Sequence, residues 1–376
     1  MNDAAPRKQP DTAARPASAL PSEGTGEVRD GRDNNRSANR IRGSKATLSS
    51  VASLAGVSKQ TVSNVLNSPH LVRSDTAERV KAAIAELSYR PHQGAQQLRT
   101  RRSQLLGLRI HQVPDPTVLD RFLHAVTDIA AESDYRIILY TAADDDREID
   151  TYAELLDRWN IDGLVLSSTH SGDRRTRHLH DQGVPFVSFG RPWDGPHHHS
   201  WVDVDGRAGT RSATEQLITA GHRRIGFIGW PEGSETGDDR LSGWADALSA
   251  AGLARPEPRR GTNDFPSGWA ATTDLLRDDD VTAMVCVSDQ MGLGALSAAR
   301  DAGRAVGSDF CIIGFDNSDA AVAADLSSLS QPLRLVADNC LRIVFNQIQH
   351  PGEGPAPEHV LLAPTLELRG STGHPG

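Results

Sequence analysis

At 376 residues the chain is long enough for two or three domains with their own hydrophobic cores, and no apolar run approaches the roughly 18 residues of a transmembrane helix. The net charge of −9 is unevenly spread: residues 1–104 hold 17 Lys and Arg against 9 Asp and Glu, and the rest hold 23 against 40, which predicts a polyanionic partner for the front of the chain alone. Three scattered cysteines exclude a disulfide framework and fit the reducing cytoplasm, where we expect the protein to act.

Residues 1–44 are rich in Pro, Ala, Gly, Asp and Arg and contain almost no large apolar side chains. Such a segment cannot bury a core, so we expect a disordered extension. Its first ten residues, MNDAAPRKQP, lack the apolar stretch of a signal peptide.

The stretch from Thr47 to Asn67 has the periodicity of two short helices with a glycine between them. The first helix has one apolar face, made of Leu48, Val51, Ala52 and Ala55. Gly56 ends it, because a residue without a Cβ enters the left-handed conformation at low cost, and Ser58 can cap the second helix. Two short helices around a glycine turn predict a helix-turn-helix, whose second helix enters the major groove of DNA.

A third helix completes a domain over residues 45–91. Ser74 and Asp75 begin this helix, and Pro91 prevents its continuation. On the second helix, the outward side chains are of the kinds that hydrogen bond to base edges and phosphates: Lys59, Gln60, Thr61, Ser63 and Asn64. This polar face favours a DNA-binding domain over an ordinary three-helix bundle.

From Thr47 onward the sequence resembles the DNA-binding headpiece of the lactose-repressor (LacI/GalR) family of bacterial transcription regulators, through AGVSKQTVSNVLN and YRPHQGAQQLRT. The resemblance implies that Lys59, Gln60 and Asn64 read bases, since lysine suits guanine and glutamine suits adenine. It also implies backbone-phosphate contacts, some from residues that cap helices as well: Thr47, Ser58, Ser63, Asn67, Thr76 and Tyr89.

Residues 92–104 contain HQGAQQLRT, which by itself is a weak helix because it is short and has Gly94 inside it. A flexible linker is one interpretation. The resemblance implies instead a hinge that becomes helical when two copies meet in the minor groove, with Leu98 inserted between base steps, Ala95 allowing close approach and Arg99 holding a phosphate. We favour the hinge, since a bare linker does not need this sequence.

From Leu105 onward, apolar strand-like runs alternate with amphipathic helical stretches. The expected strands are 105–110, 135–141, 162–168, 184–190, 224–229, 283–288 and 311–316, and the helices include 118–133, 152–159, 209–220, 241–251, 292–302 and 333–349. Buried strands alternating with helices predict parallel sheets. The length favours two Rossmann-like lobes, the type I periplasmic-binding-protein architecture that the family shares. We expect lobe 1 over about 105–205 and 332–352, and lobe 2 over about 206–331 and 353–370.

Ligands of open α/β sheets bind beyond the carboxyl ends of the strands. Those ends carry acids, arginines and aromatics, including Trp193 and Trp230, a mixture that suits sugars. The resemblance assigns effector contacts to Arg240, Ser288 and Asp316, with Phe265 as a possible stacking residue. The full expected effector set is Asp115, Arg191, Arg240, Phe265, Ser288, Asp289 and Asp316. As alternatives, Asp289 caps the following helix and Asp316 organises its own turn. Trp244 and Trp269 are expected in the core.

Some segments depart from the family pattern or from known site motifs. HQVPDP after the first strand and FGRPW after the fourth both leave the effector's identity open. Consecutive histidines at 197–199 project in different directions, which favours a solvated loop over a metal site. We find no phosphate-binding loop, nucleophile elbow or zinc spacing, so neither an enzyme nor a cofactor is expected.

Together, these features lead us to expect a sequence-specific repressor that binds a near-palindromic operator as a homodimer, under allosteric control by a small carbohydrate between the lobes. No leucine heptad follows Pro351, which favours a dimer over a tetramer. One alternative is the same build controlled by a nucleobase or a phosphorylated metabolite, as an inducer or as a corepressor. The other is a sugar-binding protein without a regulatory role.

Overall fold

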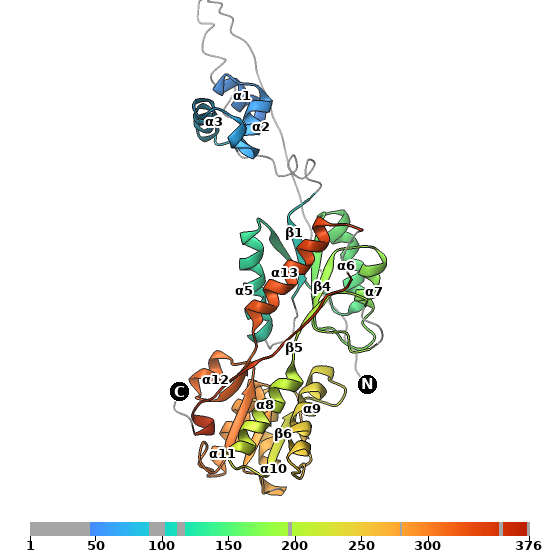
Figure 1. The fold of residues 1–376 in the computed structure, drawn as a ribbon, viewed down its shortest axis with the longest axis vertical. Helices are drawn as coiled ribbons and strands as arrows, with labels where there is room; N and C mark the ends of the chain where they lie inside the picture. Colours follow the sequence, from blue (N-terminus) through green and yellow to red (C-terminus); the bar gives the residue numbers. More distant parts are fainter. Residues whose placement is uncertain are drawn as a thin grey trace, which may run out of the picture. The chain divides into compact units, whose positions relative to one another are not determined.

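The computed structural model describes residues 46–89, 102–110, 117–194, 198–278, 280–352 and 356–373 (Figure 1). The chain divides into two compact units, residues 1–96 and 97–376. The expected extension over 1–44 and most of the hinge, with Ala95, Leu98 and Arg99, lie outside the described residues, as does Asp115. No helix in the described ranges combines the length and apolar character needed to cross a membrane.

The first unit contains the predicted helix-turn-helix and the third helix behind it. Its elements are α1 (Leu48–Ala55), α2 (Lys59–Asn67), η1 (Pro69–Leu71) and α3 (Ser74–Glu86). Val51, Val62 and Val80, one from each α-helix, are fully buried against one another. Gly56 ends α1 in the left-handed conformation, with φ at 65°. The headpiece fold is therefore confirmed.

The second unit contains two six-stranded sheets, one in each lobe, as the alternating pattern predicted. The first sheet is wholly parallel, in the order β11 (His359–Leu362), β5 (Trp201–Val204), β4 (Phe186–Phe189), β3 (Gly163–Ser167), β1 (Leu105–Arg109) and β2 (Arg136–Tyr140). The second has the order β12 (Thr365–Glu367), β10 (Ser327–Ser330), β9 (Cys311–Phe315), β8 (Ala283–Cys286), β6 (Ile225–Gly229) and β7 (Arg259–Arg260), with β12 antiparallel to β10.

Helices cover the sheets of both lobes (Figure 1). In lobe 1, α5 (Thr117–Glu132) and α13 (Leu333–Gln349) pack together on one face, and α6 (Asp145–Asp157) and α7 (Arg174–Asp181) cover the other. Lobe 2 contains α8 (Gly206–Thr219), α9 (Glu235–Ala250), α10 (Phe265–Asp278), α11 (Asp289–Asp301) and α12 (Asp319–Ala323), and its last residues form η2 (Gly370–Thr372). The expected helix over 333–349 is confirmed.

The path of the chain between the lobes differs from the expected one near its end. We placed residues 353–370 in lobe 2, but β11 pairs with β5 in the first sheet, and only β12 belongs to the second. The chain therefore crosses between the lobes near residues 205, 331 and 363. Strand β11 lies at the sheet edge with alternating exposure, and its apolar stretch, residues 360–362, is too short to stand out in the sequence. The helices α7 and α10 were also not anticipated.

Replacing Gly294 in α11 with alanine is expected to destabilise lobe 2. A Cβ there would lie 2.2 Å from the carbonyl oxygen of Phe265 and 2.6 Å from the amide nitrogen of Trp269, both in the backbone of α10. Helix propensity favours alanine by about 1 kcal/mol, whereas overpacking costs about 1–3 kcal/mol or more. The clash should therefore outweigh the gain in propensity, and the free energy of unfolding should fall. Thermal unfolding should show a lower Tm. Gly292→Ala is the matched control, because its Cβ would first meet the end of the Leu326 side chain, at 3.0 Å. An unchanged Tm for Gly294→Ala would mean that α10 and α11 separate at little cost.

Candidate DNA interface and effector cleft

Helix α2 presents a polar face opposite its buried Val62 and Val65. Lys59 and Gln60 are exposed in the first turn. Gln60 Nε2 donates to Asn64 Oδ1 over 3.0 Å, so these two amides lie side by side, one helical turn apart. An ammonium group next to paired amides offers the donors and acceptors that read base edges in a major groove.

Two of the expected phosphate contacts also cap helices. The Ser58 hydroxyl accepts a hydrogen bond from Thr61 N over 3.0 Å at the start of α2. Thr47 forms a capping box with Ser50 at the start of α1. The dual role expected for Ser58 is therefore half established: the cap is present, and its phosphate contact stays a prediction.

The other expected headpiece contacts differ in the surface that they offer. Asn67 is exposed, and its Nδ2 donates to the carbonyl oxygen of Ser63 over 2.7 Å. Thr76 is half-buried at the start of α3. Tyr89 is 7% exposed and belongs to the headpiece core, so it offers DNA the least surface.

A cavity of about 250 Å³ lies between the two lobes, beside the carboxyl ends of strands from both sheets. Trp193 from lobe 1 and Trp230 from lobe 2 both line it. Its polar lining comes from Ser167, Ser168, Thr169, Asp203, Thr236, Arg240, Asn263, Asp316 and Gln331. The cavity thus combines two indoles with hydroxyls, amides, carboxylates and one guanidinium.

Arg240 lies in the wall of this cavity and is 5% exposed. Its Nη1 donates to the carbonyl oxygen of Val287 over 2.6 Å, and its guanidinium carbon lies 3.5 Å from the ring centre of Phe315. Burial lowers the pKa of Arg240, and nearby carboxylates, first Asp316 and then Asp203, oppose this shift. The guanidinium is therefore held in place before any ligand arrives.

The other expected effector residues separate into two groups. Asp316 lines the cavity, where its Oδ1 accepts a hydrogen bond from Gln331 Nε2 over 2.7 Å. Its φ of 111° supports the alternative that it also organises its own turn. Phe265 is 43% exposed at the start of α10, and neither it, Arg191, Ser288 nor Asp289 is among the described lining residues.

Ser288 and Asp289 have structural roles that the sequence left open. Ser288, and not Asp289, is the N-cap of α11, and it also donates to Asn263 Oδ1. The cap expected from Asp289 is therefore wrong. Its carboxylate instead accepts hydrogen bonds from Ser318 N and Ser328 Oγ, both over 2.6 Å. Burial raises the pKa of Asp289, and these bonds oppose the shift.

Sequence reasoning missed three polar residues of the cavity: Asp203, Asn263 and Gln331. Asp203 and Gln331 lie in segments where the chain was expected to cross between the lobes. The expected crossing points could therefore have indicated both residues, because a segment that passes between the lobes also passes beside the cleft. Asn263 lies two residues before Phe265, the side chain that was expected to contact the effector from this loop.

Polar contacts join the lobes on more than one side of the cleft. Arg121 pairs with Asp319 over 2.6 Å. Ser171 N donates to Glu235 Oε1 over 2.9 Å. Burial pushes the pKa of Glu235 up, but this bond and a bond from its own backbone hold it below the usual value. In this structure the two lobes are therefore joined directly by an ion pair and a hydrogen bond.

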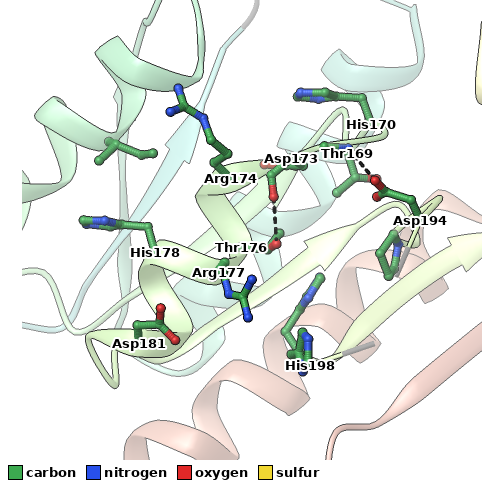
Figure 2. Close-up of a pocket in the computed structure, with 14 residues that line it drawn as sticks. Thr169, His170, Asp173, Arg174, Thr176, Arg177, His178, Asp181, Asp194 and His198 are labelled. Carbon is green, nitrogen blue, oxygen red and sulfur yellow. Dashed lines mark hydrogen bonds between the residues drawn. The ribbon is translucent and has the colours of Figure 1, made fainter. Parts of the chain in front are cut away.

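A second cavity of about 510 Å³ lies in lobe 1, against α7 and the loop after β3 (Figure 2). Thr169 lines both cavities. Charges of both signs face this space, among them Arg177, Asp181 and Asp194, so it selects neither anions nor cations clearly. Gly172 N donates to Asp194 Oδ2 over 2.8 Å, which ties the loop after β3 to the loop after β4.

Asp145, His170 and Asp173 offer three possible metal-ligand atoms within 4.8 Å of one another. Two carboxylates and an imidazole could hold a divalent cation. However, the fully buried Arg175 pairs with Asp173 over 2.7 Å and lies 3.5 Å from Asp145. Arg175 thus offsets part of the charge of these acids, and His170 Nε2 lies 3.1 Å from Asp145 Oδ2, so all three side chains already have protein partners, which favours a structural role.

The histidine run behaves differently at its two described positions. His198 is exposed, as expected, and its ring lies 6.1 Å from that of His180. His199 is buried, so the expected solvated loop is wrong at this position. Its ring stacks on Phe186, and its Nε2 lies 2.9 Å from Ser188 Oγ.

Comparison with known proteins connects both units to one group. Two family models match: "Bacterial regulatory proteins, lacI family" over residues 47–92, and "Periplasmic binding protein-like domain" over residues 214–372. The chain is 36% identical over 337 residues to the HTH-type transcriptional regulator CelR of Thermobifida fusca, which covers 87% of this chain and 98% of CelR.

Solved structures agree with this relationship. A transcriptional regulator CelR–cellobiose complex is 34% identical, with a TM-score of 0.65, and covers 87% of this chain and 99% of its own. A lac repressor dimer bound to operator and the anti-inducer ONPF is 26% identical, with a TM-score of 0.76, over 88% and 99%. Because these relatives are regulators and not enzymes, and because the resemblance spans headpiece and core alike, this chain belongs to the LacI family of HTH-type transcriptional regulators.

Proposed function

We propose that the protein is a transcriptional repressor that binds a near-palindromic operator as a homodimer and is released from it by a small carbohydrate. The cavity between the lobes is the observation that carries this proposal. Trp193 and Trp230 offer apolar faces for a sugar ring, and Asp203, Asp316 and Arg240 offer charged partners for vicinal hydroxyls. The complex of CelR with cellobiose supports the same ligand class.

The charges around the cavity favour a neutral sugar over a phosphorylated metabolite. Asp203 and Asp316 line the cavity with one guanidinium, that of Arg240. That guanidinium already lies 3.8 Å from Asp316, and the nearby acids Asp203 and Asp239 pair with Arg191, which does not line the cavity. A phosphate would therefore meet two lining carboxylates and no uncommitted guanidinium among the described lining residues. A nucleobase stays the alternative, since flat rings also stack on indoles.

On the DNA side, the exposed face of α2 is proposed to enter the major groove, with Lys59, Gln60 and Asn64 at base edges. We also propose that the hinge, with Ala95, Leu98 and Arg99, enters the minor groove between the half-sites. The lac repressor dimer bound to operator supports binding of DNA by a dimer. The protein would act on the nucleoid in the cytoplasm.

A ligand panel tests the proposal. We expect cellobiose or another small neutral sugar to raise the Tm, because a ligand that binds only the folded state stabilises it by mass action. The same sugar should weaken binding to DNA from upstream of the protein's own gene, measured by footprinting. Nucleobases and sugar phosphates complete the panel. A Tm increase with a nucleobase alone would replace the sugar by the alternative. Sugar binding without any sequence-selective DNA binding would point to a protein without a regulatory role.

A further inference from the structure

Arg191 lies where a loop of lobe 1 meets lobe 2. It follows β4 and Gly190, whose φ of 118° favours glycine. A Cβ on Gly190 would lie 2.4 Å from the hydroxyl oxygen of Thr169. That hydroxyl donates to the carbonyl oxygen of Arg191 over 2.9 Å. The backbone of Arg191 is thus fixed by the loop after β3, whose Thr169 lines both cavities.

The guanidinium of Arg191 joins two carboxylates from different lobes. Its Nε lies 2.9 Å from Oδ2 of Asp203 in β5, and its Nη2 donates to Oδ2 of Asp239 in α9 over 2.8 Å. The same oxygen of Asp239 accepts a hydrogen bond from Arg207 N over 3.0 Å, which fixes the carboxylate. Burial raises the pKa of Asp203, and Arg191 opposes that shift. Arg191 is therefore held by two protein acids, and it is not among the described lining residues of the effector cavity.

The same guanidinium supports an aromatic wall of the effector cavity. Its carbon lies 4.7 Å from the ring centre of Trp193, within the range of a cation–π contact. Trp193 lines the cavity from lobe 1. Asp239 thus reaches the Trp193 indole through a single intervening side chain. If the lobes separate, Asp239 moves away with lobe 2, and the guanidinium loses one of the two partners that hold it against the ring.

We propose that Arg191 is a positioning residue that connects lobe closure to the placement of Trp193 in the effector cavity. This positioning role replaces the direct effector contact that we expected for Arg191 from the sequence. In the closed arrangement, Asp239 holds Arg191, and Arg191 holds the indole where a sugar ring can stack on it. Opening of the lobes releases the indole. The statement about sugar stacking rests on the proposed function, whereas the connection from Asp239 to Trp193 does not.

The connection can be tested without any ligand. Protein labelled with 5-fluorotryptophan carries six such residues, and Trp193→Phe identifies the ¹⁹F resonance of Trp193. Asp239→Asn keeps the shape of the side chain and removes its charge, so this resonance should shift or broaden. Asp246→Asn is the matched control, because Asp246 also lies in α9 and pairs with Arg207 over 2.7 Å, within lobe 2. An unchanged Trp193 resonance in Asp239→Asn would overturn the proposal.

A double-mutant cycle then tests the effect on binding, with cellobiose as the first probe. Asp239→Asn should weaken binding about tenfold in the presence of Trp193 and much less in Trp193→Ala, since residues joined through a shared partner are not additive. Arg191→Lys, which keeps the charge but loses the forked geometry, should abolish this coupling. Equal losses in both backgrounds would show that Asp239 acts without Trp193. Failure of every panel sugar to bind would contradict the proposed function, while the fluorine result would still decide the connection.

Discussion

Replacing Arg240 with alanine is expected to give a protein that still binds its operator and no longer responds to sugar. Among the described lining residues of the cavity, Arg240 supplies the guanidinium, and protein groups hold it on several sides. Val287 accepts its hydrogen bond, Phe315 lies under its guanidinium, and Asp316 lies 3.8 Å from its Nη1. A donor held this rigidly costs a ligand little entropy to engage.

The expected loss of sugar affinity is about 10- to 100-fold. A hydrogen bond from a charged donor contributes about 1.5–3 kcal/mol, and about 1.4 kcal/mol corresponds to a factor of ten. Truncation also leaves Asp316 without its guanidinium neighbour, so the carboxylate becomes costlier to keep ionised. Isothermal titration calorimetry measures the sugar affinity, and fluorescence anisotropy measures operator binding with and without sugar.

Two further variants separate a ligand contact from a loss of stability. Arg240→Lys keeps the charge without the fork, so it should bind sugar with intermediate affinity if the guanidinium geometry matters. Arg207→Ala removes an arginine that is 54% exposed and pairs with Asp246, and it should respond to sugar normally. Normal induction in Arg240→Ala would place the effector elsewhere, and the second cavity beside α7 would be the next candidate.

The headpiece could be predicted almost completely from the sequence because its determinants are local. Apolar spacing fixed α1 and α2, and the conformational freedom of Gly56 fixed the turn between them. The β/α alternation likewise predicted the parallel strands of both sheets, although β12 at the edge of the second sheet is antiparallel. Strand β11 escaped prediction because its place depends on a partner, β5, that lies more than 150 residues away in the sequence. An edge strand of four residues has no periodicity strong enough to reveal such pairing.

The sequence could predict which regions form the candidate site, but it could not predict which side chains pair with one another there. Arg240 and Asp316 were expected at the cleft, and both line it. Arg191 was expected to contact the effector, but whether its guanidinium is free depends on Asp203 and Asp239, which reach it only through the fold. Local sequence likewise could not separate the tryptophans: Trp244 is fully buried, whereas Trp269 is 38% exposed and bonds to Asp301.

Exchanging the polar residues of the first turn of α2 is expected to change which operator half-site the protein prefers. Lys59→Ala and Gln60→Ala should each lower discrimination at one base pair by about 1–3 kcal/mol, the range measured for side chains that read base edges. Because Gln60 hydrogen bonds to Asn64, loss of the Gln60 amide also frees Asn64 to turn. The two amides should therefore show coupled effects at neighbouring bases, and Lys59 should act independently.

Binding to a library of half-site variants, repeated at several salt concentrations, measures both specificity and charge. Lys81→Ala is the control, since Lys81 is an exposed lysine of α3 and its loss removes the same charge. It should leave the order of preferred sequences unchanged. Loss of a phosphate contact lowers affinity equally on all sequences, and it reduces the number of counterions released on DNA binding by about one. If Lys59→Ala gave that uniform result, Lys59 would be a backbone contact, and base reading by α2 would fall to Gln60 and Asn64.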